Sequence, residues 1–297
     1  MKRLTRNRVL QYANELVLEI EKENEVPALQ KLISEINLLV ELTDNIESWI
    51  IRSVEQEKFI LTEHDFKKLM NDLLEKIEKI TNEKLKEKLQ KKLVFAHEEN
   101  HKNINSQNYS KLLRKQFAKL YSILVKYQDE SIHFSDDMIK LINNRFGTER
   151  NGFVQVFLSH AYLDRLYTLG LFKFFYDKGV YLYIDWMHNT ASNQQNVVPL
   201  KQLLGQELDN SNQLLFLRTI NSELSISGGN HQVRQWCSWE IGYFEKSKGL
   251  NSQNNKLFYI DAYIDETIDE YYYSNNHKSF LINNFNLFRN VQNGNLV

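Results

Sequence analysis

Glycine is distributed very unevenly along this chain of 297 residues. The sequence holds 10 glycines, and the first of them is Gly147. Glycine is the usual residue of tight turns and bulges, so a stretch of this length without glycine favours helices over a sheet. Proline is also scarce in this stretch, with Pro27 as its one example. We therefore predict that residues 1–148 form an all-helical domain.

Apolar side chains in this first half recur at helical intervals. One run follows the 4-3-4-3 spacing of a heptad seam and comprises Phe66, Met70, Leu73, Ile77 and Ile80. The phase then shifts to Leu85, Leu89 and Leu93. Further amphipathic helices are predicted over residues 9–20, 29–51 and 109–127, with Pro27 in the first turn of the second. Together they predict a helical bundle, which we interpret as an assembly or sensor domain because it carries no motif for chemistry.

The composition excludes several classes of protein. Lys plus Arg total 37 and Asp plus Glu total 38, unlike the strongly basic proteins that bind duplex nucleic acid. A single cysteine excludes a disulfide framework and a zinc site built from several thiolates, so we expect no metal. We find neither a signal peptide nor a run of about 18 apolar residues. We expect a cytoplasmic protein whose partners are neither membranes nor nucleic acids.

The second half alternates between short apolar runs and amphipathic segments. Strands are predicted over residues 153–158, 180–184, 214–217 and 257–260, and helices over residues 163–178, 199–208 and 231–247. This alternation predicts an α/β fold with a parallel sheet that helices cover on both faces. Ligands of such sheets bind outside the carboxyl ends of the strands. A site is therefore expected among the loops over residues 159–164, 185–198 and 218–231.

Several familiar active-site motifs are absent from these loops. The sequence has no Gly-rich dinucleotide fingerprint after Leu158, no phosphate-binding loop and no His-Glu-x-x-His pair. Ser159 does not lie in a Gly-x-Ser-x-Gly elbow. Cys237 is expected in the middle of a helix, far from the N-terminal amides that would activate a thiol. These absences argue against the common nucleotide-binding and nucleophilic hydrolase sites.

One predicted helix holds a cluster of aromatic residues and a carboxylate. Trp236 and Glu240 are four residues apart and therefore lie on one helix face. An aromatic side chain beside a carboxylate could bind a flat cationic ring that is attached to a sugar. In the other interpretation, Glu240 is a solvated residue at the helix edge, and the aromatic residues belong to the core: Trp236, Trp239, Tyr243 and Phe244. Spacing alone leaves both interpretations open.

Three blocks of the second half, taken together, resemble a bacterial Toll/interleukin receptor (TIR) domain. The blocks are Val156–Asp164 (VFLSHAYLD), Gly179–Trp186 (GVYLYIDW) and Trp236–Phe244 (WCSWEIGYF). They occur in the family's order and spacing, and the similarity covers about residues 152–265. Three segments depart from the family pattern: the Asn/Gln-rich loop 188–198, the long stretch 222–235, and residues 266–297, which match no family block.

The resemblance implies a flavodoxin-like TIR domain over residues 149–297 and an enzyme that cleaves NAD⁺ at the nicotinamide–ribose bond. It assigns the catalytic role to Glu240. The matching substrate-binding positions lie in the first loop, in the gating loop and beside Glu240: Ser159, His160, Asp164, Asp185, Trp186 and Trp236. NAD⁺ is then the substrate, and no separate cofactor is expected.

One carboxylate is sufficient for this chemistry. Nicotinamide leaves as a neutral group from a cationic pyridinium, so the leaving group needs no general acid, unlike that of an ordinary glycoside. An ionised Glu240 can stabilise the oxocarbenium-like ribose or attack it. The requirement for a charged Glu240 limits how dry its surroundings can be.

Three functions of different classes stay open. The first is a TIR NAD⁺ glycohydrolase of bacterial anti-phage defence, with ADP-ribose or a cyclic ADP-ribose as product and oligomerisation through the helical domain as its control. It predicts homo-oligomers through both domains and an unidentified activator. The second is a non-enzymatic TIR adaptor acting through TIR–TIR contacts, which has no need of Trp236 and Glu240. The third is a nucleoside or nucleotide glycosyl transferase of similar fold.

Overall fold

The structure is a computed structural model that describes ten segments of the chain. These are residues 6–55, 63–81, 83–101, 132, 134–147, 152–188, 197–219, 221–225, 231–248 and 257–261. The helix predicted over residues 109–127 lies outside them, as do residues 266–297. The described helices include none that is long and apolar enough to cross a membrane.

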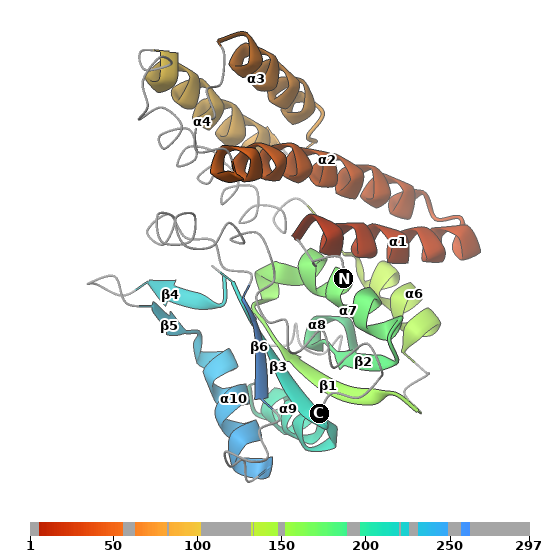
Figure 1. The fold of residues 1–297 in the computed structure, drawn as a ribbon. Coiled ribbons are helices and arrows are strands. Elements are labelled where there is room, and N and C mark those ends of the chain that lie inside the picture. The colour runs from red at the N-terminus through yellow and green to blue at the C-terminus, as the bar shows by residue number, and fades with distance from the viewer. Residues whose placement is uncertain are drawn as a thin grey trace. The chain divides into compact units, whose positions relative to one another are not determined.

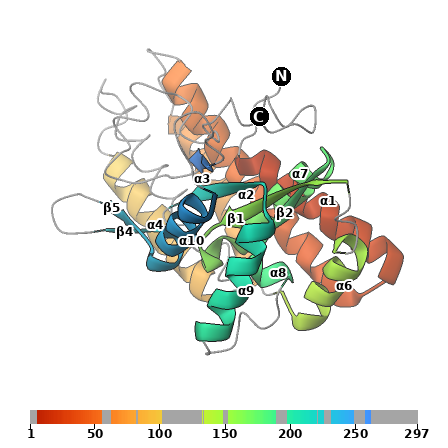
Figure 2. The same cartoon turned by 90° about the horizontal axis from the view of Figure 1, so that it is seen from below.

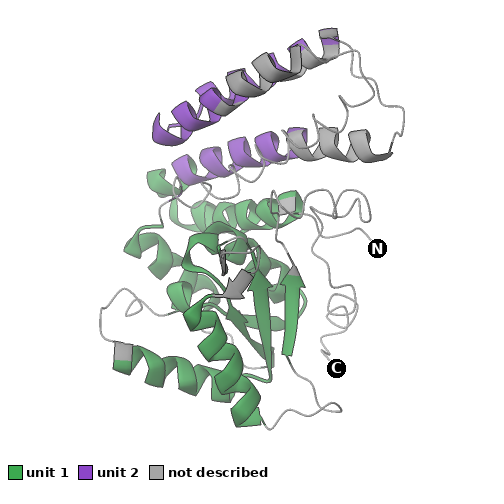
Figure 3. Ribbon diagram, turned by 90° about the vertical axis from the view of Figure 1, so that its left-hand side faces the viewer, with its two compact units in different colours: residues 1–30, 134–263, 281–297 green, residues 31–133, 264–280 purple. Residues whose placement is uncertain are grey.

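The chain divides into two compact units, which Figure 3 shows in different colours. Unit 1 consists of residues 1–30, 134–263 and 281–297, and unit 2 of residues 31–133 and 264–280. Unit 1 therefore takes two stretches of the first half of the chain together with the α/β part. The predicted domain boundary between residues 148 and 149 stays a prediction.

Every secondary-structure element that the structure describes in the first half of the chain is a helix, as the scarcity of glycine predicts. Its helices are α1 (Arg6–Asn24), α2 (Pro27–Glu55), α3 (Glu63–Glu78), α4 (Glu83–His101) and α6 (Asp136–Phe146). Pro27 is the first residue of α2, a position where its missing N–H costs no helical hydrogen bond. The Ser135 hydroxyl accepts a hydrogen bond from the Met138 N–H and so caps α6.

In unit 2 the heptad seam forms the contact between α3 and α4. These two helices pack against each other, and the described seam residues are buried: Met70, Leu73, Ile77, Ile80, Leu85, Leu89 and Leu93. The turn between the helices accounts for the phase shift seen in the sequence. The larger helical bundle stays a prediction.

Unit 1 is built on a parallel sheet of four strands. They are β1 (Val154–Ser159), β2 (Val180–Tyr183), β3 (Gln213–Arg218) and β6 (Leu257–Asp261), in the spatial order β2-β1-β3-β6 (Figure 1). Every neighbouring pair is parallel. This is the strand order of a flavodoxin-like fold, so the predicted α/β class is confirmed.

Besides α1 and α6, unit 1 contains five helical segments from the second half of the chain. They are η1 (Tyr162–Asp164), α7 (Arg165–Tyr176), α8 (Asp185–His188), α9 (Val197–Asn210) and α10 (Gln235–Lys248). Helices α9 and α10, which lie side by side in Figure 2, pack with β1 and β3 into one core. That core includes Phe157, Leu204, Leu208, Phe216 and Phe244. The alternate residues of β1 and β3 are also buried and point to the opposite face.

Helix α1 packs against α7 within unit 1. A Cβ atom added to Gly170 of α7 would lie 2.0 Å from the Val9 carbonyl oxygen of α1, so the backbones approach closely only because residue 170 is glycine. Lys173 Nζ extends the contact, 2.9 Å from Glu19 and 2.7 Å from Asp177. The sequence analysis did not predict this contact.

Two details correct the predicted elements. The helix predicted over residues 231–247 begins at Gln235, because residues 231–233 form β5 (His231–Val233), which pairs antiparallel with β4 (Glu223–Ser225). A strand of three residues is too short to show an alternating pattern in the sequence. It is recognised only by its pairing with β4 in the structure. The polar loop predicted from residue 185 also begins with a single helical turn, α8.

Candidate active site

The carboxyl end of β1 and the first turns of α10 meet in a buried polar contact. Ser159, the last residue of β1, donates a hydrogen bond of 2.6 Å from its hydroxyl to Glu240 Oε2. Both residues are buried, although 81 positions separate them in the sequence. β1 is a central strand of the sheet, so the contact lies where flavodoxin-like folds bind their ligands. The structure thus brings together two of the residues selected from the sequence.

Burial determines the electrostatics of Glu240. Loss of solvent is the largest effect and raises the pKa of the Glu240 carboxyl well above its ordinary value, and the charge of Asp185 raises this pKa further. The hydrogen bond from Ser159 acts in the opposite direction by stabilising the carboxylate. The Glu240 carboxyl therefore holds its proton more tightly than an exposed glutamate does, and a cation placed beside it would favour the ionised form.

His160 and Asp185 form a second contact at the same end of the sheet. His160 Nδ1 lies 3.0 Å from the Leu158 carbonyl oxygen, and Nε2 lies 3.3 Å from Asp185 Oδ1. The imidazole is 2% exposed, whereas the Asp185 side chain is 31% exposed. Asp185 is therefore the member of this pair that a ligand in solution can reach.

Asp164 is fully buried among hydrogen-bond donors from the segment after β3. Its carboxylate accepts a bond of 2.6 Å from the Thr219 hydroxyl and one of 2.7 Å from the Asn221 amide. Asp164 thus fastens the loop after β1 to the loop after β3. Its implied part in substrate binding stays a prediction.

Trp186 is also buried, and its indole N–H donates a hydrogen bond of 3.0 Å to the Thr168 hydroxyl of α7. Its ring centroid lies 5.1 Å from that of Phe134. The indole thus anchors α8 to the body of unit 1 and leaves the neighbouring Asp185 at the surface. Its place in a gating loop stays a prediction.

Trp236 lies at the surface, one turn of α10 before Glu240. It is 39% exposed and makes an edge contact with Trp239, with ring centroids 5.9 Å apart. The Lys201 ammonium lies 5.9 Å from the Trp236 ring and 5.6 Å from the Trp239 ring. Trp236 is therefore an accessible aromatic surface that already attracts a cation.

Cys237 is not suited to nucleophilic chemistry. Burial and the nearby Glu240 raise the pKa of its thiol to about 12, so the thiol stays protonated at neutral pH. The Sγ atom lies 3.5 Å from the His160 carbonyl oxygen. The sequence analysis expected Cys237 in the middle of a helix, and this placement is wrong because α10 begins at Gln235 and Cys237 lies in its first turn. Burial, and not distance from the helix N-terminus, keeps this thiol unreactive.

Thr219 and Asn221 are site-supporting residues that sequence reasoning did not select. They lie in the segment 218–231, which the topology had predicted as part of the crevice. Their polar character gave no specific signal, because Thr and Asn are ordinary loop residues. Only the contact with Asp164 identifies their part in the site.

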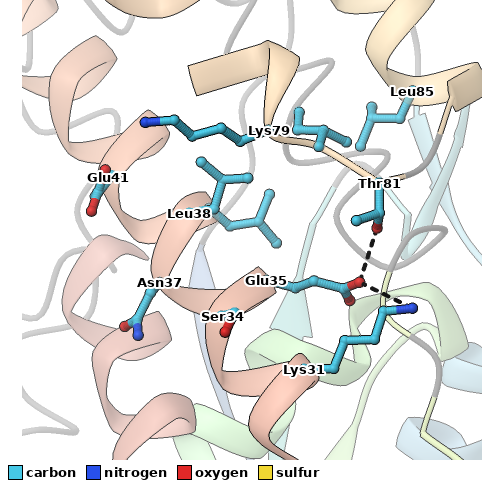
Figure 4. Close-up of a pocket in the computed structure, with 11 residues that line it drawn as sticks. Lys31, Ser34, Glu35, Asn37, Leu38, Glu41, Lys79, Thr81 and Leu85 are labelled. Atoms are coloured by element: carbon cyan, nitrogen blue, oxygen red, sulfur yellow. Dashed lines mark hydrogen bonds and ion pairs between the residues drawn. The ribbon is translucent and has the colours of Figure 1, made fainter. Parts of the chain in front are cut away.

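No group of three or more His, Cys, Asp or Glu residues in the described segments could hold a metal ion. A cavity of about 340 Å³ lies in unit 2, between α2 and the α3–α4 turn (Figure 4). Its lining residue Glu35 accepts a hydrogen bond from Thr81 and lies 4.0 Å from Lys31. This cavity brings no reactive groups together, so the Ser159–Glu240 contact is the better candidate site.

Comparison with known proteins finds a distant relative. The chain is 26% identical over 140 residues to the probable 3′ cyclic ADP-D-ribose synthase ThsB′ of Bacillus cereus (strain MSX-D12). The match covers 45% of this chain and 68% of that protein. No family model matches the chain, and no solved structure matches it significantly. The length of the match is that of a single domain and not of the whole chain.

Proposed function

We propose that the protein is an NAD⁺ nucleosidase that cleaves the nicotinamide–ribose bond, with Glu240 as its catalytic residue. The observation that carries the proposal is the buried Ser159–Glu240 hydrogen bond at the carboxyl end of β1. A distant relative named as a probable 3′ cyclic ADP-D-ribose synthase supports it, because that name describes a product made from an ADP-ribosyl donor. The TIR resemblance assigns the same glutamate.

The electrostatics of Glu240 suit a cationic substrate. Burial and Asp185 disfavour the Glu240 carboxylate, whereas the positive nicotinamide ring of bound NAD⁺ would favour it. The carboxylate then lies ready to stabilise the positive charge that develops on the ribose as neutral nicotinamide departs. Substrate binding thus supplies the ionised form that catalysis requires.

The other predicted site residues either contact the substrate or support the site in this proposal. Ser159 orients the Glu240 carboxyl, while Asp185 and Trp236 present a carboxylate and an aromatic face at accessible positions. His160, Asp164 and Trp186 are buried side chains that hold the loops of the site in place. All six belong to the proposed substrate site, Asp185 and Trp236 by direct contact and the other four by support.

The biological setting is part of the proposal. The product is ADP-ribose or a cyclic ADP-ribose, made in bacterial anti-phage defence, and activity depends on homo-oligomerisation through the helical segments. This control by assembly rests on the TIR resemblance and on a first half of the chain that carries no chemistry of its own.

The test is NAD⁺ consumption by the purified full-length chain, with products separated by chromatography at low and high protein concentration. We expect turnover to rise faster than linearly with protein concentration. The Glu240→Gln variant should lose about 100-fold or more of the activity. Glu245→Gln is the matched control, because Glu245 is an exposed glutamate of the same helix. Full activity of Glu240→Gln would refute the assignment, and no turnover at any concentration would favour the adaptor function.

A further inference from the structure

Helix α8 is a single helical turn, Asp185–His188, that follows directly after β2. A turn this short is not stable alone, because ordering the first turn costs more conformational entropy than its few hydrogen bonds offset. The carbonyl groups in the last turn of a helix also have no helical N–H as partner. The position of α8, and with it that of Asp185, therefore depends on contacts with other elements.

Two of these contacts come from the neighbouring α7 and β2. The Trp186 indole N–H donates a hydrogen bond of 3.0 Å to the Thr168 hydroxyl of α7. His188 Nε2 lies 2.6 Å from the Tyr181 hydroxyl of β2. Both contacts hold side chains of α8, whereas its backbone is held by a third element.

The third element is α6, which precedes the sheet in the sequence and packs against α8 (Figure 2). The Asn143 side chain donates a hydrogen bond of 2.5 Å from Nδ2 to the Met187 carbonyl oxygen, across 44 positions. Phe134, just before α6, contacts Trp186, with ring centroids 5.1 Å apart. This region therefore holds both the backbone and a side chain of α8.

The Asn143 amide acts through this one bond. A carbonyl oxygen only accepts, so the amide must present Nδ2 to Met187. The Oδ1 atom of Asn143 is buried, and no donor in the described segments reaches it. Met187 is itself fully buried, so loss of the Asn143 donor would leave its carbonyl group without this bond in a place that disfavours an unsatisfied acceptor.

Helix α6 is itself seated on the rest of unit 1. Phe146 packs against Phe172 and Tyr176 of α7, with ring centroids 5.9 and 5.1 Å apart. Arg145 Nε lies 3.1 Å from Glu23 of α1. These contacts make α6 a fixed support from which Asn143 reaches α8.

We propose that Asn143 is a positioning residue that holds α8, and therefore Asp185, in the arrangement that binds substrate. Its effect on catalysis rests on the proposed function, in which Asp185 contacts NAD⁺. Without the Asn143 bond, α8 is in place in only a fraction of the molecules. The apparent affinity for substrate falls by that fraction, whereas bound substrate restores the arrangement. Loss of the bond therefore acts on KM and not on kcat.

The first test reads α8 directly and needs no enzymatic activity. The backbone N–H groups of Met187 and His188 donate to the Ile184 carbonyl oxygen, so their hydrogen exchange reports whether the turn is formed. Asn143→Ala in the full-length chain should speed this exchange by about two- to tenfold, as expected for one lost hydrogen bond. The matched control is Asn144→Ala, because Asn144 is the exposed neighbour in α6. Equal exchange in both variants would overturn the proposal.

A second variant, Asn143→Asp, keeps the size of the side chain. A carboxylate offers only acceptors and cannot donate to the Met187 carbonyl group, so exchange should be at least as fast as in Asn143→Ala. Alanine has a higher helix propensity than asparagine, so neither alanine variant weakens α6 by its local preference. Unchanged exchange in Asn143→Asp would count against the bond.

The second test separates KM from kcat for NAD⁺. Asn143→Ala should raise KM by about two- to tenfold and leave kcat within about twofold, while Asn144→Ala should change neither. A merely structural Asn143 would lower the folded fraction, and so kcat at unchanged KM, which would refute the proposal. If Glu240→Gln keeps full activity, the proposed function fails, while hydrogen exchange still decides whether Asn143 holds α8.

Discussion

Gly170→Ala should separate α1 from the α/β core. The new Cβ would lie 2.0 Å from the Val9 carbonyl oxygen, whereas real contacts are no closer than about 3.0 Å, so the helix has to move by about 1 Å. A gap of that size forfeits about a quarter to a half of the dispersion energy across the interface. The affected side chains of α1 are Val9, Ala13, Leu16, Val17 and Ile20. We expect a net loss of about 2 kcal/mol in the free energy of unfolding.

The assay is thermal and urea unfolding of the full-length chain followed by circular dichroism. A loss of about 2 kcal/mol corresponds to a Tm lower by about 4–8 °C for a unit of this size. The matched control is Gly242→Ala in α10, where an added Cβ meets nothing within 4 Å. This control should gain up to about 1 kcal/mol from its higher helix propensity. Equal stabilisation by both alanines would refute the close packing of α1 on α7.

Three further outcomes follow from the site. Folding raises the pKa of Glu240, so its contribution to stability is present at low pH and lost as pH rises through the raised value. Glu240→Gln should therefore flatten the decline in urea stability as pH rises above the ordinary range of a carboxyl group. Burial and a thiol pKa of about 12 should leave Cys237 unreactive toward iodoacetamide at pH 7.5 until the protein unfolds. Mass spectrometry measures the labelling, and rapid labelling of the native protein would contradict this prediction. Asp164→Asn should lower the free energy of unfolding in urea by about 1–3 kcal/mol, because the amide of Asn cannot accept both buried hydrogen bonds. Unchanged stability together with a raised KM for NAD⁺ would instead make Asp164 a substrate ligand.

The elements of this protein could largely be predicted from local patterns. The scarcity of glycine and proline indicates the helices of the first half, and the alternation of apolar runs after Gly152 indicates the strands of a parallel sheet. Such patterns are reliable because they reflect neighbouring residues on one helix face or strand. The three-residue strands β4 and β5 were not predicted, because they are too short to carry a period.

The candidate site could be located only in part. The topology places a crevice at the carboxyl ends of the strands, and the TIR resemblance selects Ser159, His160, Asp185 and Glu240. It does not distinguish the half-buried Asp185 and the exposed Trp236 from the buried Asp164 and Trp186. Exposure depends on what packs over a side chain, and that is absent from a local pattern.

The sequence by itself determined the types of element, their order along the chain and the chemistry available at the strand ends. Only the tertiary structure decided that Ser159 bonds to Glu240 across 81 positions, and that Asp164 takes Thr219 and Asn221 as partners. The packing of α1 against Gly170 of α7 was likewise decided only by the tertiary structure. The physical reason is that helices and strands arise from short-range periodicity, whereas these contacts depend on how the whole chain crosses over the sheet.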